Sequence, residues 1–333
     1  MRQRVRRGAA PAILSAVLVL VAALAGCGSG GGDDAGPDEN RPLVMGSSGT
    51  PESLVMAQIY AGALRTAGAH VAVDPRIGGD TAQLDAMQRG DVDLFPAFTG
   101  RLLTELAPSL AQAATSPVSP APSTQPAADG AAAGDPNSDA LYVDLNHSLP
   151  QGVSVGDATP VSATPQLFVA TSLATTAGVS DLSGCGRLPA DLPVVTTGEP
   201  DPATLQAFAD AGCRMGPVQR VADVHTVLER TASGTALGLL TPLQIGGDSA
   251  SGPAGLVEAL PALAGSAGRG VGPQPETLVP VYRTAALTRD QVKAVNRVAG
   301  EITTADLATL AGKVRAGAHP ADLAADWLNE HQI

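Results

Sequence analysis

Residues 43–53 read LVMGSSGTPES, and this short stretch indicates the type of fold. The apolar run Leu43 to Gly46 predicts a short buried strand. Thr50-Pro51-Glu52 then supplies an N-cap, a proline at the first helical position and an acidic residue in the first turn. Apolar residues at helical spacing continue from Leu54 to Leu64. We therefore expect a strand that is followed at once by a helix.

The same alternation continues along the chain. Residues 70–77 alternate as a strand, Gly78-Gly79-Asp80 leads into a helix that ends at Gly90, and residues 92–95 form a third strand. This β-α-β-α-β order predicts a parallel sheet whose ligand-binding loops lie at the carboxyl ends of the strands.

A second α/β unit and a helical ending follow. The predicted strands are residues 167–171, 192–197, 236–241 and 278–283. Of the predicted helices, one ends before Gly178 and two cover residues 201–212 and 224–230. Three more begin at Thr288, Thr303 and His319-Pro320. We expect an α/β protein of two lobes, each with a mixed, mostly parallel sheet flanked by helices. Lobe I takes residues 43–163 and 276–333, and lobe II takes residues 164–275.

Residues 108–138 interrupt lobe I with alanine, proline, serine, threonine and glycine and almost no large apolar side chain. Such a composition buries too little surface to offset its ordering entropy. We interpret this stretch as a disordered insertion whose role the sequence leaves open.

The N-terminus has the layout of an export signal. Four arginines precede an apolar stretch that is too short for a trusted membrane span. Residues 24–27, Leu-Ala-Gly-Cys, resemble the bacterial lipobox, which implies a signal peptide over 1–26, acylation (palmitate) on Cys27 and a place on the outer face of the cell membrane. The glycine-rich residues 27–42 predict a flexible tether. The alternative is an ordinary signal peptide with a chance cysteine.

Charge and composition exclude several classes of function. The chain has 20 basic and 32 acidic residues, and loss of the four N-terminal arginines takes its net charge from −12 to −16. So negative a surface repels phosphate backbones, which argues against nucleic-acid binding. None of the five histidines has a partner at metal-ligand spacing, and no nucleophile, base and oxyanion hole assemble. We expect no metal, no cofactor and no catalysis.

Two cysteines remain in the mature chain, Cys185 and Cys213. In an exported protein such a pair predicts a disulfide more readily than a metal site or a nucleophile.

Several motifs resemble a known family. In order and spacing, residues 43–53, 77–83 (IGGDTAQ), 90–103 (GDVDLFPAFTGRLL), 278–283 and 299–328 resemble the substrate-binding proteins of osmoprotectant ABC importers. These proteins bind glycine betaine, choline and carnitine. The resemblance implies a type II periplasmic binding protein, a Venus-flytrap fold of two α/β lobes that closes on its ligand.

The resemblance also implies where a ligand would lie. The family holds a quaternary ammonium in a box of tyrosines, whose ring faces attract a cation that cannot donate hydrogen bonds. One box position falls on Phe98, and the others fall on Pro165, Leu239 and Glu276, which are not aromatic.

The carboxylate side of the site differs as well. Arg101 follows Thr99-Gly100 where the family usually has a small polar or acidic residue, and a shorter side chain, Ser48, replaces a longer polar one. Arg101 could contact a carboxylate or phosphate together with the nearby helix N-terminus, and Glu276 could receive an amine or guanidinium. The candidate ligand-binding residues are Ser48, Thr50, Phe98, Thr99, Arg101, Gln166, Thr241 and Glu276.

Plainer roles remain open for these residues. Arg101 could be solvated, Glu276 could simply pair with Arg101, Phe98 could belong to the core, and Ser48 and Thr50 could only cap a helix.

We interpret the chain as an extracytoplasmic solute-binding lipoprotein that acts as a monomer. It would hold a small polar or zwitterionic solute between its lobes and deliver it to an ABC permease. Two alternatives remain: the same fold with a changed class of ligand, such as another zwitterion or an amino-acid derivative, and an envelope interaction lipoprotein without a role in transport.

Overall fold

The computed structural model describes residues 41–74, 77–109, 136–246, 253–262 and 271–333. The predicted signal peptide, the lipidation site Cys27, most of the tether and residues 110–135 of the predicted insertion lie outside these ranges.

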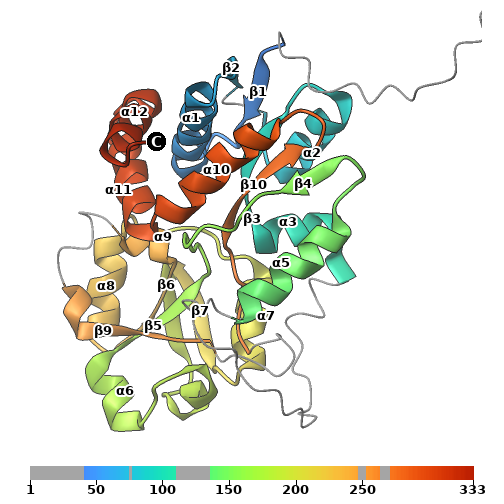
Figure 1. The fold of residues 1–333 in the computed structure, drawn as a ribbon. Coiled ribbons are helices and arrows are strands. Elements are labelled where there is room, and N and C mark those ends of the chain that lie inside the picture. Colours follow the sequence, from blue (N-terminus) through green and yellow to red (C-terminus); the bar gives the residue numbers. More distant parts are fainter. Residues whose placement is uncertain (1–40, 75–76, 110–135, 247–252, 263–270) are drawn as a thin grey trace, which may run out of the picture. The chain divides into compact units, whose positions relative to one another are not determined.

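The first sheet has five strands in the order β2-β1-β3-β10-β4 (Figure 1). Its strands are β1 (Leu43–Gly46), β2 (Val71–Asp74), β3 (Leu94–Phe98), β4 (Val153–Val155) and β10 (Leu278–Arg283). The helices that follow these strands or join them are α1 (Pro51–Thr66), α2 (Asp80–Arg89), α3 (Thr99–Leu106), α5 (Pro136–Ser148), α10 (Arg289–Glu301), α11 (Thr304–Arg315) and α12 (Pro320–Glu330).

The helix ends agree with their sequence signals. Thr50 caps α1 by accepting a hydrogen bond from the Ser53 backbone N–H at 3.3 Å. Gly90 ends α2 with φ at 82°, a left-handed conformation that favours glycine. Thr288 and Thr303 form capping boxes at the starts of α10 and α11.

The last three helices return to the first sheet, as predicted. They share one apolar core with α1, which includes Tyr60 and Trp327. Figure 1 shows α1 beside α11 and α12. The C-terminal part of the chain therefore completes the core that the first strand and helix begin.

The third strand lies further along than predicted. It runs over Leu94–Phe98 instead of residues 92–95, and all of its residues are buried. The reason is its pairing with β10, which joins Phe98 to Leu278 and so extends the sheet to the start of α3. Phe98 thereby becomes the residue that precedes this helix.

The two acids just before β3, Asp91 and Asp93, lie in different surroundings. Asp93 is fully buried, whereas the carboxylate of Asp91 is exposed beside Arg89. The Asp93 carboxylate accepts hydrogen bonds from Arg283 and from the backbone N–H of Val44. It thus joins β10 to β1.

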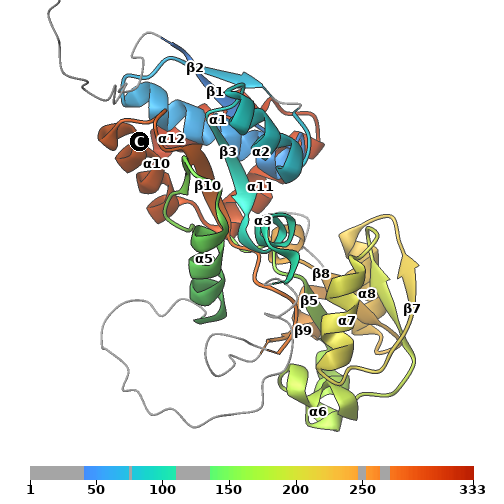
Figure 2. The same ribbon diagram turned by 90° about the vertical axis from the view of Figure 1, so that its right-hand side faces the viewer.

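The second sheet also has five strands, in the order β7-β6-β8-β5-β9. Its strands are β5 (Gln166–Ala170), β6 (Leu192–Thr196), β7 (Met215–Arg220), β8 (Leu237–Leu240) and β9 (Val257–Leu260). Its helices are α6 (Thr171–Ala177), α7 (Pro202–Asp210), α8 (Val224–Ala232), α9 (Pro242–Ile245) and the 3₁₀ segments η1 (Leu182–Arg187) and η3 (Pro253–Leu256). Figure 2 shows α7 and α8 against this sheet.

Both sheets are mixed and mostly parallel, as expected: of the five described strands in each, four run in one direction, and β10 in the first sheet and β5 in the second run the opposite way. In each, two neighbouring pairs are parallel and two are antiparallel. The antiparallel pairs arise where β10 and β5 enter their sheets between strands of the opposite direction. Long-range chain crossings such as these leave no local signal in the sequence.

Several elements were absent from the sequence-based expectation, among them the helices α3, α5 and α9 and the strands β4, β7 and β9. Strand β4 has only three residues, β7 contains Gly216 and Pro217, and β9 lies next to residues outside the described ranges. Helix α5 begins inside the predicted insertion and buries Leu141 and Leu145 against the core beside α3.

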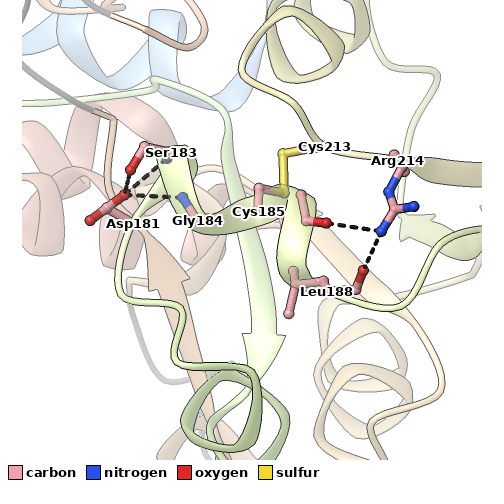
Figure 3. The surroundings of a disulfide bond; sticks show 8 residues. Asp181, Ser183, Gly184, Cys185, Leu188, Cys213 and Arg214 are labelled. Atoms are coloured by element: carbon pink, nitrogen blue, oxygen red, sulfur yellow. Dashed lines mark hydrogen bonds between the residues drawn. A yellow bond between two sulfur atoms is a disulfide. The ribbon is translucent and has the colours of Figure 1, made fainter.

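In the structure a disulfide joins Cys185 and Cys213, with their Cα atoms 4.9 Å apart (Figure 3). It connects η1 to the residues between α7 and β7. Nearby, Arg214 donates hydrogen bonds to the carbonyl oxygens of Gly186 and Leu188. The cross-link therefore lies in a locally well-bonded part of the second unit.

Candidate functional site

A cavity of about 770 Å³ opens where the strands of the first sheet end. Ser48 follows β1, Phe98 ends β3, and Asp80 and Arg101 stand in the first turns of α2 and α3. The ends of parallel strands and the starts of the following helices are the usual place for ligands in such sheets. The local β-α alternation thus builds the wall of this cavity.

A second cavity of about 410 Å³ adjoins the first and shares Phe98, Arg101 and Glu276 with it. It is also lined by Pro165 and Leu239. All four positions that the family resemblance assigns to an aromatic box therefore lie around one cavity. Phe98 is the one aromatic side chain among the residues that line these two cavities.

The ring of Phe98 is already covered. The guanidinium of Arg101 lies 4.7 Å from its centroid, a cation–π contact within one turn of chain. Only 7% of Phe98 is exposed. A second cation would reach this ring only if Arg101 moved away.

Glu276 lies against the start of α3. Its carboxylate accepts a hydrogen bond from the backbone N–H of Arg101 at 3.2 Å. Gly100 makes this approach possible, because a Cβ there would come within 2.9 Å of the carboxylate and 2.8 Å of the Pro275 carbonyl oxygen. Burial raises the pKa of Glu276 to about 7, although Arg101 opposes this shift.

Two further acids line the larger cavity with Arg101. Burial raises the pKa of Asp80, with a further contribution from Glu105, whereas Arg101 lowers it. Glu105 accepts a hydrogen bond from the Thr81 hydroxyl at 2.6 Å. Asp80 and Glu276 thus interact electrostatically with Arg101, and Glu105 lines the same cavity.

The predicted ligand-binding residues divide into two groups. Those that line a cavity are Ser48, Thr50, Phe98, Arg101, Thr241 and Glu276. Thr99 and Gln166 are not among the lining residues of either cavity. The Thr99 hydroxyl is instead engaged with the backbone of Pro275 and Thr277, and Gln166 is the first residue of β5.

Ser48 and Thr50 already have partners within the loop. Their hydroxyl oxygens lie 3.3 Å apart, and the Ser48 backbone N–H donates to the hydroxyl of Ser53. This network holds the loop before α1 in shape, so the capping role considered for Thr50 is present in the structure.

Sequence reasoning missed Asp80 and Glu105 as lining residues. A signal existed for both. Asp80 begins a helix directly after two glycines, and Glu105 stands four residues after Arg101, which puts the two on the same face of α3.

Metal binding and membrane crossing by a helix both lack a structural basis among the described residues. No group of three or more His, Cys, Asp or Glu side chains is arranged to hold a metal ion within the ranges that the structure describes. Among the helices in those same ranges, none has both the length and the apolar character needed to cross a bilayer.

Comparison with known proteins agrees with the fold. Residues 41–201 match the family described as the substrate binding domain of ABC-type glycine betaine transport systems. A search of curated protein sequences found no match.

Two solved structures are similar over most of the chain. One is a glycine betaine/carnitine/choline ABC transporter protein (TM-score 0.61, 15% identity, 87% of this chain and 98% of that chain). The other is the apo form of YehZ from Escherichia coli (TM-score 0.59, 16% identity, 87% of this chain and 98% of that chain). At these identities the likeness shows the fold, which is that of the two-lobed periplasmic binding proteins.

Proposed function

We propose that this chain, whose residues 41–201 match the substrate-binding domain of glycine betaine ABC transport systems, is the solute-binding component of an ABC importer. It captures a small polar solute and presents it to a membrane permease. No chemical step is needed, because closure on the solute is a shift between two conformations that the permease distinguishes.

The cavity at the strand ends carries this proposal. It brings together residues from the loop after β1, from α2, from α3 and from the segment before β10, which are far apart in the sequence. Arg101 and Glu276 offer opposite charges to a solute that has polar groups of both kinds. Ser48, Thr50 and Thr241 add hydroxyl groups at helix starts, where the helix dipole favours an anionic group.

The N-terminal motif supports a place in the cell. We propose that Cys27 is acylated after removal of residues 1–26 and anchors the protein to the outer face of the membrane, with residues 27–42 as a tether. The chain would act as a monomer next to its permease.

The test is saturable solute binding by the purified mature chain. Ligand that binds only the native state raises its stability, by about 2.7 kcal/mol at a hundredfold excess over Kd. Fractions of a cell extract are screened by thermal unfolding, and the solute in an active fraction is identified by mass spectrometry and titrated by calorimetry.

The matched variants are Arg101→Ala, inside the cavity, and Arg65→Ala, on α1 outside it. A changed affinity in the first and not in the second supports the site. Unchanged affinity in Arg101→Ala contradicts the site assignment. The absence of any saturable solute favours the envelope interaction protein.

A further inference from the structure

The arrangement around Arg101 bears on the chemical class of the solute, an inference that rests on the proposed function. Three carboxyl groups, those of Asp80, Glu105 and Glu276, line the larger cavity on the side of the first sheet. Arg101 is the one basic side chain among that cavity's lining residues. Even with Arg101 counted, this wall carries an excess of acidic groups and suits a cation.

The kind of cation depends on what the wall offers. A quaternary ammonium has no N–H group and needs aromatic faces, since a ring attracts a cation without accepting a directed hydrogen bond. The lining residues supply one ring, and Arg101 covers it at 4.7 Å. Pro165 and Leu239 occupy two further positions around the same cavity and have no aromatic face.

Carboxylates instead match a cation with N–H donors. They are acceptor-only groups that bond an ammonium or guanidinium at short distance and with roughly twice the strength of neutral hydrogen bonds. The Glu276 carboxylate receives backbone hydrogen bonds from Arg101, through Oε2, and from Gly100, and Glu276 lines the cavity. Buried carboxyl groups without enough cationic partners are costly, and a bound cation removes that cost.

We infer that the solute is an organic cation that carries N–H donors, an ammonium or guanidinium group, held by Asp80, Glu105 and Glu276, and that Arg101 excludes quaternary ammonium from the ring of Phe98. Arg101 acts here as a specificity residue. Its backbone fixes Glu276, while its side chain occupies the face that a methylated cation would need.

The experiment compares probes that differ only in methylation of the nitrogen. Ethanolamine is paired with choline, glycine with glycine betaine, and lysine with its Nε-trimethyl form, and agmatine represents the guanidinium class. Each is titrated by calorimetry into the mature chain and into two variants, Glu276→Gln and Glu330→Gln. Glu330 is an exposed acid at the end of α12, outside the cavity, so its variant controls for loss of a negative charge alone.

We expect at least one unmethylated or guanidinium probe to bind about tenfold or more tightly than its methylated partner. Glu276→Gln should weaken that binding at least tenfold, and Glu330→Gln should leave it unchanged. Circular dichroism confirms that each variant is folded. Should Glu276→Gln fail to fold, Asp80→Asn replaces it with the same expectation.

A second variant tests the exclusion. Arg101→Ala uncovers Phe98, so the ratio of affinities between unmethylated and methylated probes should fall. An unchanged ratio contradicts the role of Arg101.

Equal or tighter binding of the methylated partners would overturn the inference while leaving solute binding intact. Failure of every probe would also overturn it, and the screen of cell-extract fractions then decides separately whether the chain binds another solute.

Discussion

The Nε atom of Arg283 lies 2.9 Å from the Oδ1 atom of Asp93, inside the protein. Asp93 has no exposed surface, and its other carboxylate oxygen accepts the backbone N–H of Val44 at 2.8 Å. Arg41, the first residue that the structure describes, also donates a hydrogen bond to the Asp93 carboxylate. One carboxylate therefore connects the beginning of the folded chain, the loop before β3 and the end of β10.

This arrangement predicts a large difference between two neighbouring acids. Asp93→Ala removes the hydrogen bonds that the buried carboxylate accepts from Arg283 and Val44 and should lower the free energy of unfolding by about 1.5–3 kcal/mol. Asp91→Ala removes an exposed pair with Arg89 and should cost at most about 1 kcal/mol. Urea unfolding of both variants measures the two values, and equal losses would contradict the role assigned to Asp93.

The buried carboxyl of Glu276 predicts a dependence of stability on pH. Its pKa rises to about 7 in the folded chain through burial, whereas an unfolded glutamate titrates near about 4.3. Between these values the folded state binds more protons than the unfolded state, so the free energy of unfolding falls as pH rises. The ionised, buried carboxylate of Glu276 destabilises the folded state fully above about pH 7 and not at all below about pH 4.

Glu276→Gln should remove this contribution. The difference in thermal midpoint between Glu276→Gln and the parent chain should increase from pH 5 to pH 8. The corresponding difference for Glu330→Gln should stay constant. A constant difference for Glu276→Gln across this range would show that Glu276 titrates at its ordinary value. Asp80, whose pKa is raised in the same direction, remains in both chains.

The disulfide predicts a loss of stability on reduction. Cys185 and Cys213 are 28 residues apart, and a cross-link over such a loop contributes about 3–4 kcal/mol in the chain-entropy account. Cys185→Ala/Cys213→Ala should unfold at correspondingly lower urea. A reductant should destabilise the parent chain and leave the double variant unchanged. Free thiols in the purified parent protein would contradict the pairing.

Acylation of Cys27 is tested by Cys27→Ala. The parent protein should incorporate labelled palmitate and partition into detergent, and the variant should do neither. Glu330→Gln, an exposed position on α12 far from the lipobox, serves as a control because it leaves that motif intact. Unlabelled parent protein would support the ordinary signal peptide instead.

Local patterns predicted much of the fold. The Thr50-Pro51-Glu52 start of α1, the glycine that ends α2 and the capping boxes of α10 and α11 are signals that act within a few residues, and the structure confirms them. The last helices share the first core with α1, and Cys185 lies bonded to Cys213 in the structure.

Only the tertiary structure decided the rest. Strand β3 reaches Phe98 because β10 pairs with it, and Asp93 is buried because Arg283, 190 residues away, lies beside it. Asp80 and Glu105 line the cavity through the placement of α2 and α3. The sequence by itself determined where the helices with clear end signals, α1, α2, α10 and α11, begin or end, since backbone capping depends on near neighbours. The partners of a buried charge and the walls of a cavity come from segments that meet only after folding. The tertiary structure was therefore needed to identify them.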